Sequence, residues 1–276
     1  MASATDILVQ TVRGGDPDRY LSTLYAPREH RDALTALYAF NIEIASVRDK
    51  IAEALPGEVR LQWWRDALRN REGGGHPVAS ALIDAIERHG LPAHTFDSMI
   101  DARIFDLYDD PMPDRVSLEG YCGETASALI QLAGLVLDPE RAPAFADAAG
   151  HAGCAQAIAG LLRSLPIHRR RGQCYIPQDV LAAAGTDREA FLEGEDKDAA
   201  VRAVMAMTAL GRDHYGRFLD AAEGLPASLR PAYLPALLSR DYLARVARRP
   251  ADALDKVVGI SPVRRHWRMF MSATRG

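Results

Sequence analysis

The sequence has few cysteines and no long apolar run. Cys122, Cys154 and Cys174 are far apart and never form a C-x-x-C pair, so neither a disulfide framework nor a zinc or dithiol redox motif is indicated. No run of about 18 apolar residues occurs, which is the length that a membrane-spanning helix needs. The first residues also lack the basic segment and following apolar stretch of a secretory signal. We therefore expect a cytoplasmic protein in a reducing compartment, with at most peripheral contact at the inner membrane.

The sequence also lacks an excess of one charge, alternating strand patterns and clustered histidines. Its 33 Lys and Arg residues oppose 37 Asp and Glu, which gives a formal charge of −4 and no overall attraction to nucleic acid. None of the eight histidines stands in H-E-x-x-H or a comparable ligand spacing, so a zinc site is not expected. Alternating runs of β-branched and aromatic residues are essentially missing, which argues against strands.

What the sequence does have is helical periodicity along most of its length. Ala, Leu and Arg recur at helical spacing, which predicts an all-α fold. No linker divides the chain, so we expect residues 1–276 to form a single domain, and a chain of this length can bury a large share of its apolar surface in a core. Gly73-Gly74-Gly75 and residues 109–113 are turn-forming clusters between helices. Helices are predicted over residues 28–54, ended by Pro56-Gly57, and over 58–71, 78–89, 93–107, 118–135, 140–164, 178–184, 196–222 and 232–247.

Three segments carry a resemblance to a known family. They are Ala36-Leu37-Tyr38-Ala39-Phe40, Leu118-x-x-Tyr121-Cys122 and Arg171-Gly172-x-x-Tyr175-x-Pro177, and in order and spacing they resemble the squalene/phytoene synthase superfamily. The resemblance implies a single-domain helical bundle of the isoprenoid-synthase type around a central cavity. In that cavity two prenyl diphosphates are joined head to head, and two aspartate-rich segments hold magnesium.

The residues at the family's metal positions are changed in this sequence. The first motif's aspartates fall on Ala45, Ser46 and Asp49, so one of three remains. With Arg163 and Gly172 aligned to the second motif, its metal-side residues fall on Ala157, Gly160, Ser164, Ile167 and His168. Magnesium prefers oxygen ligands, above all carboxylates. We therefore expect no metal site and no cofactor, and Mg²⁺ only if the chain is nevertheless a transferase.

Several polar residues remain as candidates for a vestigial site. The resemblance places Asp49, Asp106, Tyr121, Arg163 and Tyr175 at the cavity. Asp106 resembles another acid of the family's cavity, although an ion pair or a helix cap explains it equally. Arg163, Arg170 and Arg171 belong to the densest basic cluster and are candidates for binding phosphate, or they form a solvated turn or an internal set of salt bridges.

A narrower resemblance concerns Phe40-Asn41-x-Glu43-Ile44-x-x-Val47-Arg48-Asp49 and Arg60-Leu61-Gln62-Trp63-Trp64-Arg65. These strings are similar to the noncatalytic relatives of the mitochondrial complex I assembly factor, which implies a role in respiratory-complex biogenesis with a protein partner, such as a subunit of that complex. A noncatalytic assembly or scaffold protein is thus the leading hypothesis. A prenyl transferase of isoprenoid biosynthesis is the first alternative. The second is a binding protein for an uncharged isoprenoid or quinone, since small residues replace the cavity acids.

Two further segments allow a structural or an interaction role. Trp63 and Trp64 suit a partner-binding anchor, but adjacent helical residues point about 100° apart, so we expect at least one in the core. Residues 264–271 mix arginines with Trp, Phe and Met. That composition is typical of a helix at a membrane surface or of one that docks on the protein while its arginine heads reach water.

Overall fold

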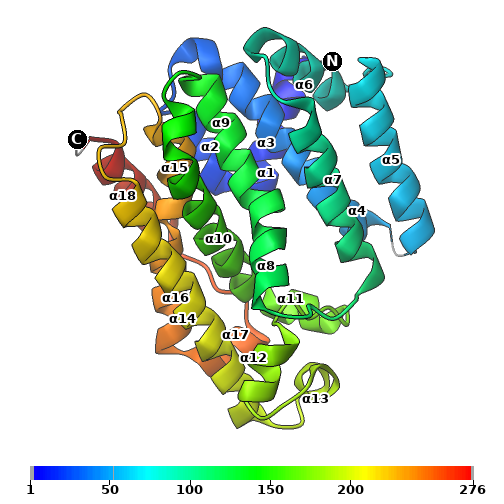
Figure 1. The fold of residues 1–276 in the computed structure, drawn as a ribbon, viewed down its shortest axis with the longest axis vertical. Coiled ribbons are helices and arrows are strands. Elements are labelled where there is room, and N and C mark those ends of the chain that lie inside the picture. Colours follow the sequence, from blue (N-terminus) through cyan, green and yellow to red (C-terminus); the bar gives the residue numbers. More distant parts are fainter. Residues whose placement is uncertain (1–2, 52, 275–276) are drawn as a thin grey trace.

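The computed structural model describes residues 3–51 and 53–274, and within them every regular element is a helix (Figure 1). The all-α prediction is therefore confirmed. The elements of the first half are α1 (Ala4–Gly15), α2 (Pro17–Thr23), η1 (Arg28–His30), α3 (Arg31–Ala45), α4 (Val47–Lys50), α5 (Ala54–Asn70), α6 (Pro77–His89), α7 (Ala93–Tyr108), α8 (Arg115–Cys122), η2 (Gly123–Ser127) and α9 (Ala128–Leu137).

The second half contains the long pair α10 and α14, which pack along each other. Its elements are η3 (Ala142–Phe145), α10 (Ala146–Arg163), α11 (Leu165–Arg170), α12 (Gln178–Ala183), α13 (Arg188–Glu193), α14 (Lys197–Ala221), α15 (Arg230–Leu237), α16 (Ser239–Arg248), α17 (Pro250–Asp255) and α18 (Pro262–Thr274). Figure 1 shows α5, α6 and α7 at one side of the molecule and α14, α16 and α18 at the other, with α8 to α10 between them.

Two groups of buried side chains hold the helices together. One is centred on α3, α6, α7 and α9 and includes Phe40, Trp64 and Phe96. The other joins the second half of α10 to α12, α14, α16 and α17. Trp64 is fully buried, with its ring 5.2 Å from that of Phe40, whereas Trp63 is partly buried under the guanidinium of Arg60. The prediction that at least one of these tryptophans packs in the core is confirmed.

The predicted first helix is interrupted in the structure. Residues 28–54 contain η1, α3 and the short α4, with Ser46 outside both α-helices, and residue 52 lies outside the described residues. Pro56-Gly57 does not end a helix, because both residues lie in the first turn of α5. Proline is tolerated there, since the first backbone N–H groups of a helix have no intrahelical partner.

Other helix boundaries also differ from the prediction. The helix expected over residues 118–135 spans α8 and α9 and contains one π-helical turn, η2, where α10 crosses it. A Cβ atom on Gly153 of α10 would meet the backbone of Ser127 at 2.3 Å, so only glycine allows this close crossing. The sequence patterns did not predict α1, α2, α11, α13 or α17. The three cysteines are free thiols, all of them buried.

Candidate functional site

A cavity of about 490 Å³ lies between α3, α4 and α7 on one side and α10, α11 and α16 on the other. This volume falls within the usual range for small-molecule sites. All but one of the residues at the family's metal positions meet here, since Ser46 is not among those that line the cavity. Ala45, Asp49, Ala157, Gly160, Ser164, Ile167 and His168 all line the cavity.

The carboxylate of Asp106 is the centre of a buried hydrogen-bond network. The hydroxyls of Tyr175 and Tyr121 donate to its Oδ1 atom at 2.7 and 2.9 Å. The guanidinium of Arg103 donates to its Oδ2 atom at 3.1 Å and to the Tyr121 hydroxyl at 2.7 Å. In addition, the side-chain amide of Gln173 donates to the Asp106 carbonyl at 3.1 Å. A buried carboxylate is stable only when it is paired and hydrogen-bonded in this way.

Burial determines the protonation of the groups around Asp106. It raises the pKa of Tyr175 and of Tyr121 far above the usual value, so both remain phenols and hydrogen-bond donors. Burial opposes the charge of Arg103, but Tyr121 and Asp106 together raise the pKa of its guanidinium. Burial lowers the pKa of His168 to about 4, so its ring, which lies 5.0 Å from that of Tyr175, is uncharged at neutral pH.

A second buried carboxylate, Asp18, lies at another part of the wall. The Tyr242 hydroxyl donates to its Oδ2 atom at 2.8 Å, and Arg163 lies 3.8 Å from the same oxygen. Arg265, from the last helix, forms an ion pair with the Oδ1 atom. Arg163 also stacks on the Tyr242 ring, 3.9 Å from its centroid. Burial, followed by repulsion from Asp16, raises the pKa of Asp18 despite these partners.

The other two cavity aspartates also have cationic partners. Asp49 pairs with Arg171, and both side chains are partly exposed at the cavity mouth. Asp16 accepts from the Arg19 guanidinium at 2.6 Å and from the Arg19 backbone N–H at 2.9 Å, since it caps α2. Each of the four aspartates that line the cavity is thus engaged by an arginine of this chain.

The structure brings together most, but not all, of the candidates. Asp49, Asp106, Tyr121, Arg163 and Tyr175 line the same cavity, as does Arg171. Arg170 does not line it, since its Nε atom donates to the carbonyl of Pro166 at 2.9 Å. The basic cluster is therefore divided, because Arg163 and Arg171 line the cavity and Arg170 does not. Asp16, Asp18 and Arg19 were missed by the sequence reasoning, although Asp16-Pro17 is a recognisable helix start.

The residues present do not fit the magnesium cluster that the family implies. Alanine, glycine and isoleucine at the metal positions offer no side-chain oxygen, and each remaining carboxylate is held by an arginine. Among residues 3–51 and 53–274, no group of three or more His, Cys, Asp or Glu side chains is placed to hold a metal ion. A hard cation with at least six oxygen ligands would have to displace these ion pairs.

The cavity is open, and side chains do not fill it. Its wall is not apolar, however. Besides four aspartates, it carries the guanidinium groups of Arg19, Arg48, Arg103, Arg163 and Arg171. A ligand of this cavity would therefore meet polar groups along much of its surface.

The chain is similar to known proteins in both sequence and structure. The chain matches the family described as squalene/phytoene synthase over residues 12–273. It is 33% identical over 244 residues to NADH dehydrogenase (ubiquinone) complex I, assembly factor 6 of Rattus norvegicus, covering 87% of this chain and 73% of that protein. It is 30% identical over 176 residues to presqualene diphosphate synthase of Zymomonas mobilis, covering 60% and 58%. The crystal structure of a dehydrosqualene synthase with ligand superimposes with a TM-score of 0.82 at 17% identity, covering 98% and 95%.

Proposed function

Because the chain belongs to the squalene/phytoene synthase family, we propose that it is a noncatalytic member that acts in the assembly of respiratory complex I. A relative that is 33% identical over most of both chains bears the name of a complex I assembly factor. The observation that carries the proposal is the state of the cavity aspartates, each of which an arginine of this chain already neutralises.

The reason lies in the chemistry that the enzymes of the family perform. Ionisation of an allylic diphosphate develops negative charge on the leaving group, and metal ions neutralise that charge. Here the carboxylates that would hold the metal are replaced or occupied, so the step lacks its main source of stabilisation. The fold is retained while its catalytic centre is lost, which suits a protein that acts by binding a partner.

A direct test of the noncatalytic state is a magnesium-dependent turnover assay with farnesyl and geranylgeranyl diphosphate. The purified protein is expected to release no pyrophosphate and to form no head-to-head product. Presqualene diphosphate synthase of Zymomonas mobilis, assayed in parallel, shows that the conditions support turnover. Magnesium-dependent product formation by this chain would establish the prenyl transferase alternative and reject the proposal.

The assembly role requires a test in cells. Deleting the gene in the organism that carries it should deplete assembled complex I on native gels and lower NADH-dependent quinone reduction, while individual subunits are still made. A plasmid copy should restore both. Unchanged levels of the assembled complex in the deletion strain would contradict the assembly role.

One observation favours a second candidate function. The cavity of about 490 Å³ remains open, and this is the volume of a site for a small organic molecule. A binding protein for an uncharged isoprenoid or quinone would use that space without any metal. Native mass spectrometry of the purified protein should then find a co-purified lipid, and a ligand-free mass would argue against this role.

A further inference from the structure

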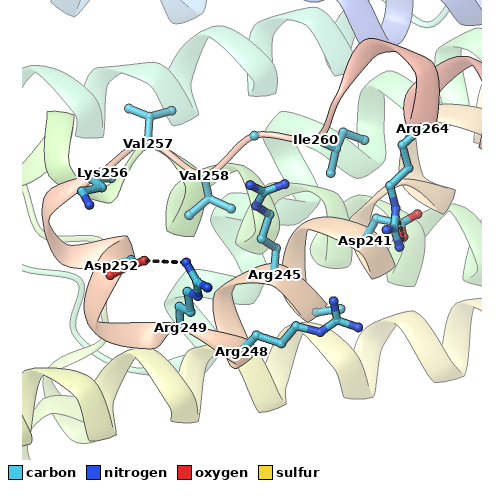
Figure 2. Close-up of a pocket in the computed structure, with 12 residues that line it drawn as sticks. Asp241, Arg245, Arg248, Arg249, Asp252, Lys256, Val257, Val258, Ile260 and Arg264 are labelled. Atoms are coloured by element: carbon cyan, nitrogen blue, oxygen red, sulfur yellow. Dashed lines mark hydrogen bonds and ion pairs between the residues drawn. The ribbon is translucent and has the colours of Figure 1, made fainter.

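A second cavity, of about 410 Å³, opens at the surface between the end of α16, α17 and the segment that leads to α18 (Figure 2). Five cations line it. Arg245, Arg248 and Arg249 come from the end of α16, Lys256 follows α17, and Arg264 begins the last helix. We call this cavity the basic pocket.

The positive charge of the basic pocket is only partly neutralised within the protein. Asp241 is buried and already accepts from Arg264 at 3.0 Å and pairs with Arg268 at 2.9 Å. Asp252 lies 3.9 Å from Arg249, as Figure 2 shows. No acid in the described part of the chain lies within ion-pair distance of Arg245, Arg248 or Lys256. This excess of positive charge is confined to the pocket, since the chain as a whole carries a formal charge of −4.

The floor of the basic pocket is held in place. The backbone N–H of Val258 donates to the carbonyl of Arg163 at 3.2 Å, and its carbonyl accepts from the Arg163 Nε atom at 3.1 Å. The side chains of Val258 and Ile260 are buried. The segment between α17 and α18 is therefore anchored to α10, and the pocket exists before anything binds to it.

An exposed apolar stripe on α18 begins beside the basic pocket. Val263, Trp267 and Phe270 are 79%, 62% and 50% exposed. Their spacing of four and three residues places them on one face of the helix. Met269 is buried and Arg265 pairs with Asp18 on the opposite face, while Arg264 lies next to Val263 and lines the pocket. The structure thus shows that α18 docks on the protein with its aromatic face uncovered.

We propose that the basic pocket and the α18 stripe form a docking surface for the phosphate headgroups of an anionic lipid bilayer. Arginine forks bind phosphate oxygens through paired N–H groups. Aromatic side chains beside them suit the boundary between headgroups and acyl chains, where an amphipathic helix lies parallel to the surface. Within residues 3–51 and 53–274, none of the helices qualifies as a membrane span. This inference does not depend on the proposed assembly role.

The first experiment is vesicle flotation with the full chain. The wild-type protein is expected to float with phosphatidylcholine vesicles that contain phosphatidylglycerol and not with phosphatidylcholine alone. Each cation near an anionic surface contributes about five-fold in affinity, so the triple variant Arg245→Gln/Arg248→Gln/Lys256→Gln should bind roughly 100-fold more weakly. All three side chains are exposed, so the variant should keep the thermal unfolding curve of the wild type.

The matched control removes three exposed cations from other helices. Arg28→Gln/Arg69→Gln/Arg88→Gln changes the net charge by the same amount at η1, α5 and α6. It should bind the anionic vesicles nearly as well as the wild type. If the two triple variants lose equal affinity, attraction is unspecific and the proposal is wrong.

The second experiment follows α18 itself. On anionic vesicles, Trp267 fluorescence should shift to the blue and be quenched by brominated acyl chains, and Trp267→Phe should remove both signals while still floating. Trp267→Ala should weaken binding several-fold, since a bulky aromatic side chain is lost from the interface. The proposal is overturned if the wild type does not float with the anionic vesicles. It is also overturned if inorganic phosphate saturates the pocket while the protein does not float, or if an acidic peptide binds as tightly as the anionic vesicles do.

Discussion

The central cavity and the basic pocket are similar in volume and both are rich in arginine, but they use that arginine differently. In the cavity, every aspartate is paired with an arginine, and two of these carboxylates are buried. In the basic pocket, three cations have no acid partner in the described chain. The difference indicates that charge in the cavity stabilises the fold, whereas charge in the pocket is free for an external anion.

The largest effect is expected at Asp106. Asp106→Asn keeps the size of the side chain but leaves Arg103 buried without its carboxylate, which typically costs about 3–5 kcal/mol. Chemical denaturation at pH 7 measures the loss in free energy of unfolding. Asp49→Asn is the control, because the Asp49–Arg171 pair is partly exposed and should contribute less than about 1 kcal/mol. Equal losses in the two variants would contradict the structural role of the buried network.

The next effect concerns pH and His168. Its pKa is lowered from 6.5 to about 4 in the folded protein, so the unfolded chain binds the proton more tightly. The contribution of neutral His168 is therefore complete above pH 6.5 and falls as the pH decreases toward 4. The loss by pH 4 amounts to about 3 kcal/mol at most.

The variant His168→Phe isolates this contribution, because phenylalanine keeps an aromatic ring beside Tyr175 and cannot titrate. Free energies of unfolding are compared for the wild type and the variant from pH 7 to pH 4.5, where other groups cancel in the difference. The advantage of the wild type should shrink as the pH falls. A difference that does not change with pH would show that His168 is not held neutral by burial.

A smaller effect is expected at Tyr242. Tyr242→Phe removes the hydrogen bond to Asp18 at 2.8 Å but keeps the ring on which Arg163 stacks. The loss should be about 1 kcal/mol, the usual net value of one hydrogen bond. Thermal unfolding at pH 7 measures it. A loss as large as that of Asp106→Asn would mean that the hydroxyl holds the Asp18 network together.

The smallest effect is expected in the basic pocket. Arg248→Gln removes an exposed cation without an acid partner, so the free energy of unfolding should stay within about 0.5 kcal/mol of the wild-type value. Urea denaturation measures this change. A destabilisation above about 1 kcal/mol would show that Arg248 has a structural role. The charges of the basic pocket would then resemble those of the cavity.

Much of the fold could be predicted because helical periodicity is local. The helices over residues 78–89, 93–107 and 196–222 agree closely with α6, α7 and α14. The break at Ser46 was not predicted. The π-helical turn could not be predicted in this way either, because it lies where a neighbouring helix, α10, packs closely against it. Gly153 shows the reason. Glycine is required at this position only because the backbone of Ser127 passes close to it. The short helices α2, α11, α13 and α17 have too few turns for a clear period.

By itself, the sequence determined the all-α class, the family, and the absence of acids at positions such as Ala45, Ser164 and Ile167, because these features depend on local spacing and residue identity. Only the tertiary structure decided that the remaining acids are occupied. Asp18 and Arg265 lie near opposite ends of the chain, and Asp106 is far in sequence from Tyr175. The basic pocket likewise requires α16 and α18 to meet. Such pairings depend on how whole helices pack, and no local pattern encodes that geometry.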